Sequence, residues 1–122
     1  MPTRDTAWEE EVLQEIVGRQ LGSVEFVQDY VQLHFDGPGL TAITQPALEV
    51  GGRELAWDTP GFRDELCRRI AREVVSARII PNVAVRLEFD DGAVVKISLR
   101  DEDYRAEEAV QFDVSAERGW AL

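Results

Sequence analysis

The fold is decided by the stretch from Val24 to Phe35, which reads VEFVQDYVQLHF. In its second half, Val31, Leu33 and Phe35 alternate with polar residues and so share one face of a strand. A polar pair at 28–29 separates this half from the apolar residues before it. The stretch therefore predicts two antiparallel strands that are joined by a tight turn and have one face in the core.

The chain repeats this pattern about 54 residues later. The tryptophans Trp57 and Trp120 then follow at a wider offset of 63 residues. Three blocks match: IVGRQLGS at 16–23 with RIAREVVS at 69–76 (offset 53), VQLHFD at 31–36 with VRLEFD at 85–90 (offset 54), and LTAIT at 40–44 with VVKIS at 94–98 (offset 54).

The repeat predicts one α+β domain over residues 1–122. It would consist of two tandem units, at about 6–57 and 58–122, each a helix followed by an antiparallel meander. The units would pack with pseudo-twofold symmetry, because neither has a filled core alone. The alternative is that alternating strands resemble one another by composition.

Two helices are predicted from capping signals and apolar spacing. The first covers about residues 7–17, with Thr6 as N-cap and Glu9 completing a capping box. The second starts at Pro60, because proline suits the first helical position. The apolar stripes that should face the core are Trp8, Val12, Leu13, Ile16 and Val17 on the first helix and Phe62, Leu66 and Ile70 on the second.

Further strands are expected between turn signals. A small hairpin at 48–55 turns at Gly51-Gly52, since glycine supplies the positive φ of a tight turn. We expect sheet edges in this hairpin and at 110–114. The strands expected are 22–27, 30–35, 40–44, 74–80, 83–89, 93–99 and 110–114, with a short edge at 119–122.

The charge of the chain limits its partners. There are 24 acids against 13 bases, a net charge of -11, which repels phosphate backbones and anionic lipid. We therefore expect no nucleic acid and no membrane as partner, but a protein, possibly basic, or a cationic ligand. The alternative is that the charge only keeps the protein soluble. The second helix is neutral within this acidic chain, and its arginines are the main place where a local positive patch could form: Arg63, Arg68, Arg69 and Arg72.

The location is predicted from cysteine use and hydropathy. The single cysteine, Cys67, excludes an intramolecular disulfide and suits a reducing cytoplasm. No apolar run follows the N-terminus, and none is long enough to span a bilayer. We therefore expect a cytoplasmic protein.

Residues that could carry chemistry are few. One histidine, His34, on the outward face of its strand, cannot form a triad or a multi-histidine metal site. Cys67 is expected as a small buried residue, and Trp120 as the tryptophan with the most exposure. Glycine-rich phosphate loops are absent. We therefore predict no catalytic, cofactor-binding or metal-binding residues.

Clusters of acids are the candidate contacts with a partner. Glu10 and Glu11 lie in the first turns of the first helix. A second group follows the strand predicted at 93–99: Asp101, Glu102, Asp103, Glu107 and Glu108. The alternative is that the acidic cluster at Asp101, Glu102 and Asp103 is a solvated turn.

Two resemblances suggest a role. The segments VEFVQDYVQL at 24–33 and ISLRDEDY at 97–104 resemble those of a family of small, functionally uncharacterised bacterial proteins. An acidic single domain of this size is also similar to the immunity proteins of bacterial toxin systems. The second resemblance implies a cytoplasmic protein-binding module that covers a basic toxin surface. The alternatives are a homo-oligomeric assembly protein, such as a homodimer joined at a strand edge, and a small-ligand domain or enzyme with a site between the halves.

Overall fold

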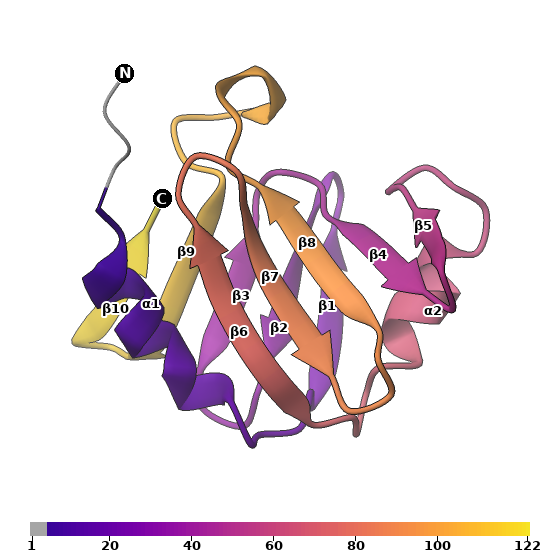
Figure 1. Ribbon diagram of the computed structural model, residues 1–122, viewed down its shortest axis with the longest axis horizontal. Helices are drawn as coiled ribbons and strands as arrows, with labels where there is room; N and C mark the ends of the chain where they lie inside the picture. The colour runs from indigo at the N-terminus through magenta and orange to yellow at the C-terminus, as the bar shows by residue number, and fades with distance from the viewer. Residues whose placement is uncertain (1–4) are drawn as a thin grey trace.

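Two five-stranded antiparallel sheets lie one behind the other in the computed structural model, with a short helix at each side (Figure 1). The structure describes residues 5–122. The expectation of no signal peptide rests partly on residues 1–4, which lie outside the described part. The α+β class predicted from the sequence is confirmed. None of the helices described is long and apolar enough to cross a membrane.

The first sheet has the strand order β1-β2-β3-β9-β10. Buried residues of β2 and β3 alternate with half-buried ones, as the sequence pattern predicts. Its strands are β1 (Ser23–Val27), β2 (Tyr30–His34), β3 (Gly39–Ala42), β9 (Val110–Ser115) and β10 (Arg118–Ala121).

The second sheet has the order β5-β4-β8-β7-β6 and lies in front in Figure 1. The predicted hairpin around Gly51 and Gly52 is confirmed, with both glycines at positive φ (57° and 80°). The strands of this sheet are β4 (Ala47–Val50), β5 (Arg53–Leu55), β6 (Val74–Ile80), β7 (Ala84–Phe89) and β8 (Val94–Ser98).

The core lies between the sheets. Both inner faces contribute to one cluster of buried apolar side chains, which the helices extend at the sides. Its largest fully buried members are Phe35, Phe62, Phe89 and Phe112. Trp120 is also buried, contrary to expectation, because it packs on Phe112 with the ring centroids 5.5 Å apart.

Each sheet combines three consecutive strands of one half with a hairpin of the other. The β4–β5 hairpin follows β3 in the chain but pairs with β8, and the β9–β10 hairpin follows β8 but pairs with β3. The structure therefore does not show the predicted pair of tandem helix-plus-meander units, since each half completes the sheet of the other. The chain crosses between the sheets twice, at 43–46 and at 99–109.

The strand edges also differ from expectation. The outermost strands are β1, β10, β5 and β6, whereas β4 and β9 are interior. The expected edge at 110–114 is therefore wrong, because β10 covers it.

The pairing register corrects the repeat. Leu33 faces Leu40 in the first sheet, and Leu87 faces Val95 in the second. By register, Val95 therefore lies 55 residues after Leu40 rather than 54, since five residues separate the paired Glu88 and Val94 and four separate the paired His34 and Gly39.

Segments 18–21 and 71–74 lie against each other. The backbone N–H groups of Gly18 and Ala71 donate to the carbonyls of Val74 and Leu21, both at 2.8 Å. In the same way, Leu21 donates to Arg72 at 3.0 Å and Val74 to Arg19 at 2.9 Å.

The first helix is shorter than predicted. Helix α1 covers Ala7–Leu13 and passes into a single 3-10 turn, η1 (Gln14–Ile16). The Thr6 side chain makes no capping hydrogen bond; instead the carboxylate of Asp5 accepts one from the Ala7 N–H at 3.0 Å. Trp8 and Val17, expected in the core stripe, are exposed.

The second helix, α2, covers only Phe62–Cys67. It begins after Pro60 because Gly61 adopts a left-handed conformation with φ 90°. Ile70, expected on its buried face, lies beyond the helix and is exposed. Beyond the helix the chain turns at Ala71, whose φ of 75° lies outside the helical region.

Candidate functional site

A cleft of about 770 Å³ lies where the two crossovers meet the outer face of the second sheet. The first crossover contributes Thr44 and Gln45, and the second contributes one wall, from Arg100 to Arg105. The strands that line the floor are β8 through Lys96 and Ser98, β4 through Ala47, β5 through Glu54, and the start of β7 with Val83 and Ala84.

The second crossover is the longer of the two. Residues 99–109 join β8 to β9, whereas residues 43–46 suffice to join β3 to β4. The loop contains the 3-10 turn η2 (Asp101–Asp103) and projects beyond the ends of the strands (Figure 1). We call residues 99–109 the long crossover.

Backbone hydrogen bonds of Leu99 and Ala109 hold the two ends of the long crossover to the body, and side-chain contacts add to them. The Ser98 hydroxyl donates to the carboxylate of Asp103 at 2.6 Å, and Arg105 pairs with Asp29 at 3.2 Å. Thr44 Oγ1, in the opposite wall, is buried and has no hydrogen-bond partner among residues 5–122.

Lys96, the single lysine of the chain, is neutralised at the floor of the cleft. Its Nζ lies 3.1 Å from a carboxylate oxygen of Glu54 and 3.2 Å from one of Glu49. These hydrogen bonds, Glu54 first, raise the pKa of Lys96 above its ordinary value of 10.5. Because two carboxylates pair with one ammonium group, this part of the floor carries a net negative charge.

The acids of the first helix divide between two roles. Glu11 is exposed, as expected of a partner contact. Glu10 instead accepts a hydrogen bond from the backbone N–H of Ile79 at 2.8 Å. Gln14 donates to the carbonyl of Ala77 on the same edge strand, also at 2.8 Å. Glu10, expected as a partner contact, therefore has a structural role, because its side chain and that of Gln14 cover the free edge of β6.

The acids of the long crossover lie together on the projecting loop. Asp101, Glu102 and Glu107 are exposed, and no ion pair or side-chain hydrogen bond engages them within the part of the chain that the structure describes. Asp103 accepts the Ser98 hydrogen bond, and Glu108 accepts one from Gln111 at 2.8 Å.

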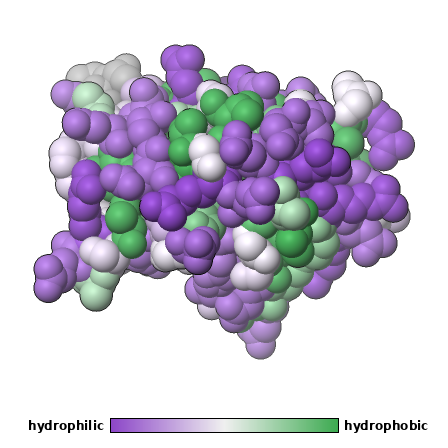
Figure 2. Space-filling model, turned by 90° about the horizontal axis from the view of Figure 1, so that it is seen from below, coloured by the Kyte–Doolittle hydropathy of each residue, from purple (hydrophilic) through white to green (hydrophobic). Residues whose placement is uncertain are grey.

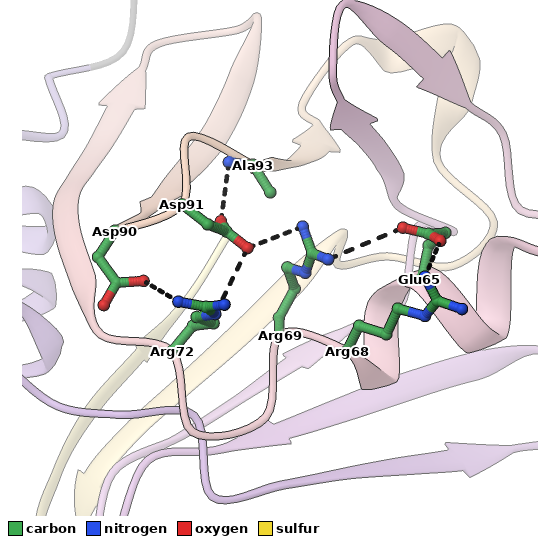
Figure 3. A network of polar contacts seen from close by, with 7 residues as sticks. All are labelled: Glu65, Arg68, Arg69, Arg72, Asp90, Asp91 and Ala93. Atoms are coloured by element: carbon green, nitrogen blue, oxygen red, sulfur yellow. Dashed lines mark hydrogen bonds and ion pairs between the residues drawn. The ribbon is translucent and has the colours of Figure 1, made fainter.

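The arginines near α2 do not form the expected positive patch. Arg69 is buried between Asp91 at 3.0 Å and Glu65 at 3.7 Å (Figure 3). Arg68 pairs with Glu65 at 3.2 Å, and Arg72 lies 3.7 Å from Asp91. The remaining arginine of this group, Arg63, lies 4.7 Å above the ring of Phe26 and 5.5 Å from that of Trp57.

A row of cations crosses the outer face of the second sheet. The register places Arg78 of β6 opposite Arg86 of β7, and Arg86 opposite Lys96 of β8. We call Arg78, Arg86 and Lys96 the cation row. Sequence analysis missed it, although the signal was present. Because side chains alternate along a strand, the inward Val85 and Leu87 place Arg86 on the outer face. The turns predicted between β6, β7 and β8 then set the register that aligns the three cations.

Single residues with reactive side chains form no cluster. His34 is half-exposed, as expected, and its Nε2 lies 3.3 Å from the carboxylate of Glu25. Cys67 is exposed rather than buried, because the short α2 turns it away from the core. Residues 5–122 contain no group of His, Cys, Asp or Glu side chains that could hold a metal ion.

The underside of the molecule has a mostly hydrophilic surface. Seen from below, apolar residues form small separate areas between charged and polar ones (Figure 2). Contact through this face would therefore depend more on charge than on apolar burial.

Comparison of the chain with protein-family models, with curated proteins and with solved structures found no match in any of the three.

Proposed function

We propose that the protein is a protein-binding module that holds a basic partner against the long crossover. The observation that carries this proposal is the length and composition of that loop. It uses eleven residues where the other crossover uses four, and five of them are acids. Loops that a scaffold does not need for packing are frequent sites of binding.

The charges of the loop fit a basic partner. Asp101, Glu102 and Glu107 project without a counter-charge among residues 5–122, so they add to the field of a chain with net charge -11. Such a field speeds the association of a positively charged protein. The cleft beside the loop is lined by three acids (Glu54, Glu102 and Asp103) and three bases (Lys96, Arg100 and Arg105), so the exposed acids of the loop, rather than the cleft, would attract a basic partner. A basic toxin is a partner of this chemistry, and neutralising it is the role of an immunity protein.

We further infer that the two halves are related by a pseudo-twofold axis. The two sheets share one strand order, with the hairpins exchanged. The hydrogen bonds between 18–21 and 71–74 also come in reciprocal pairs at an offset of 53. In such an arrangement the two crossovers occupy matching places. The extra length of the second is then an addition to the scaffold, which favours a binding role.

The test compares the wild type with two variants of equal charge. The first variant reverses the loop acids (Asp101→Lys, Glu102→Lys, Glu107→Lys). The control reverses three exposed acids elsewhere (Glu73→Lys, Glu88→Lys, Glu117→Lys). Each immobilised protein captures proteins from a lysate of the source organism, and bound proteins are eluted with salt.

The expected result is a basic protein that the wild type and the control variant retain and the loop variant loses. Measured with that protein purified, the association rate should fall about tenfold or more in the loop variant. Retention by all three proteins, or equal loss from both variants, would show that the long crossover is not the contact.

Self-association through a strand edge has less support. The edge of β6 is covered by Glu10 and Gln14, and β5 has three residues. A homodimer at β10 would have to accommodate the register shift between Arg118 and Gly119.

A further inference from the structure

The cation row is unusual because like charges face each other across neighbouring strands. Arg78 lies opposite Arg86, and Arg86 lies opposite Lys96. Facing like charges destabilise strand pairing. The row therefore lowers the stability of the sheet unless an anion lies over it.

Two members of the row have no internal counter-charge. Lys96 is paired with Glu49 and Glu54, whereas no acid lies within ion-pair distance of Arg78 or Arg86 in the described part of the chain. Both arginines are exposed. Their guanidinium groups keep five donors each for an outside acceptor.

The two arginines also line a hollow. It has a volume of about 250 Å³, and its other lining residues are Ser76, Ile80, Glu88 and Val94. Ile80 is exposed and Val94 is buried in the floor, so the hollow offers apolar contact beside the two cations. This combination suits a ligand that carries both carboxylates and methylene groups.

We propose that Arg78 and Arg86 bind an acidic, extended segment of a protein partner. On an extended chain, residues i and i+2 point to the same side, about 6.7 Å apart, so acids at alternate positions can reach both arginines. Arginine binds carboxylates through paired N–H donors. Binding also removes the repulsion within the row.

A polypeptide fits this face better than a nucleic acid. A phosphodiester carries a charge at every nucleotide, and the phosphates beyond the two arginines would approach Glu88, Glu49 and Glu54. A short acidic peptide can place its few carboxylates over the cation row without bringing negative charge close to these glutamates. This inference does not rest on the long crossover, so the two proposals can fail separately.

The test measures the affinity of the full chain for a short, fluorescently labelled peptide of alternating glutamate and alanine, by fluorescence anisotropy. The site variant is Arg78→Gln with Arg86→Gln. The control is Arg53→Gln with Arg118→Gln, two exposed arginines on other edge strands. We expect the site variant to lose about tenfold or more in affinity, since hydrogen bonds to charged groups are removed. The control should stay within about twofold of the wild type, because ordinary surface charges contribute little.

Folding of the site variant is checked by its urea midpoint, which should equal or exceed that of the wild type because repulsion is removed. Three outcomes would overturn the proposal. The peptide does not bind the wild type, both variants lose affinity equally, or inorganic phosphate or a single-stranded oligonucleotide binds through the same arginines more tightly than the peptide.

Discussion

The two sheets have the same strand order, but their outer faces carry different side chains at matching positions. Across the first sheet, the register aligns Glu25, Gln32 and Thr41 on adjacent strands. Across the second, the matching alignment is Arg78, Arg86 and Lys96. The inner faces of both are equally apolar, so the core does not dictate this difference. Charge on an outer face can therefore vary without changing the fold, and that is where binding specificity can reside.

The sides of the sheets differ as well. On the second sheet, α1 covers the edge of β6 with hydrogen bonds from Glu10 and Gln14. On the first sheet, α2 packs against β1 through the stacking of Arg63 over Phe26. One edge is closed by polar contacts with the backbone and the other by ring contacts. The two helices therefore do the same task by different chemistry.

The largest effect is expected at Arg69, which has no charged counterpart in the first half. Ile16, 53 residues earlier, is fully buried, whereas Arg69 is buried against Asp91 and Glu65. Arg69→Ala removes the buried cation between the two carboxylates, which keep only the more exposed Arg68 and Arg72, and should lower the free energy of unfolding by about 2–3 kcal/mol. Arg68→Ala is the control, because this arginine is mostly exposed, and should cost less than about 0.5 kcal/mol. Urea denaturation measures both, and equal losses would contradict the structural role of Arg69.

A smaller effect is expected at the edge of β6. Glu10→Ala removes the acceptor of the Ile79 N–H, which is partly buried, and should cost about 1–2 kcal/mol. Glu11→Ala, on the exposed side of the same helix, should stay within about 0.5 kcal/mol of the wild type. Hydrogen exchange at Ile79 provides a local check. Unchanged protection of that amide in Glu10→Ala would show that the carboxylate does not cover the edge.

The strands could be predicted from the sequence because their signal is local. Alternation of Val31, Leu33 and Phe35, and of Val85, Leu87 and Phe89, identifies the inward faces. The exchange of hairpins could not be predicted, since nothing local to residues 47–55 says which sheet they join. Pairing partners far apart in sequence depend on the whole core rather than on the strand itself.

The helices were predicted too long because tertiary contacts end them early. Gly61 and Ala71, both at positive φ, bound the second helical region, and Ala71 is a residue that rarely adopts that conformation. The same bias affected the candidate site. Spacing placed the arginines at 68, 69 and 72 on an open face, whereas acids from the β7–β8 turn, Asp90 and Asp91, reach two of them. The spacing of residues on a helix does not show which acids from distant parts of the chain will lie beside it in the fold.

Most substitutions lower the free energy of unfolding, but replacing a member of the cation row should raise it. Arg86→Gln removes a cation that faces Arg78 and Lys96, and should raise the free energy of unfolding by about 0.2–1 kcal/mol. The reciprocal change in the first sheet, Gln32→Arg, places a cation opposite Glu25 and should be neutral or slightly stabilising. Both are measured by urea denaturation at low salt. A loss of stability in Arg86→Gln would mean that the guanidinium is held by contacts within the sheet, and the contrast between the two faces would no longer stand.

The smallest effect concerns the pH dependence of Lys96. Its pKa is raised above 10.5 by Glu54 and Glu49, so its contribution to stability is complete below pH 10.5 and is lost as pH rises through the raised value. In Lys96→Arg the side chain stays charged in this range. The melting temperatures of the two proteins should therefore run parallel at neutral pH and diverge in favour of the variant above about pH 10.5. The two proteins differ at this one side chain, so the effect of pH on all other groups cancels in the comparison. Curves that stay parallel to about pH 12 would show that the two carboxylates do not stabilise the charged lysine, and the second sheet would then hold three unneutralised cations instead of two.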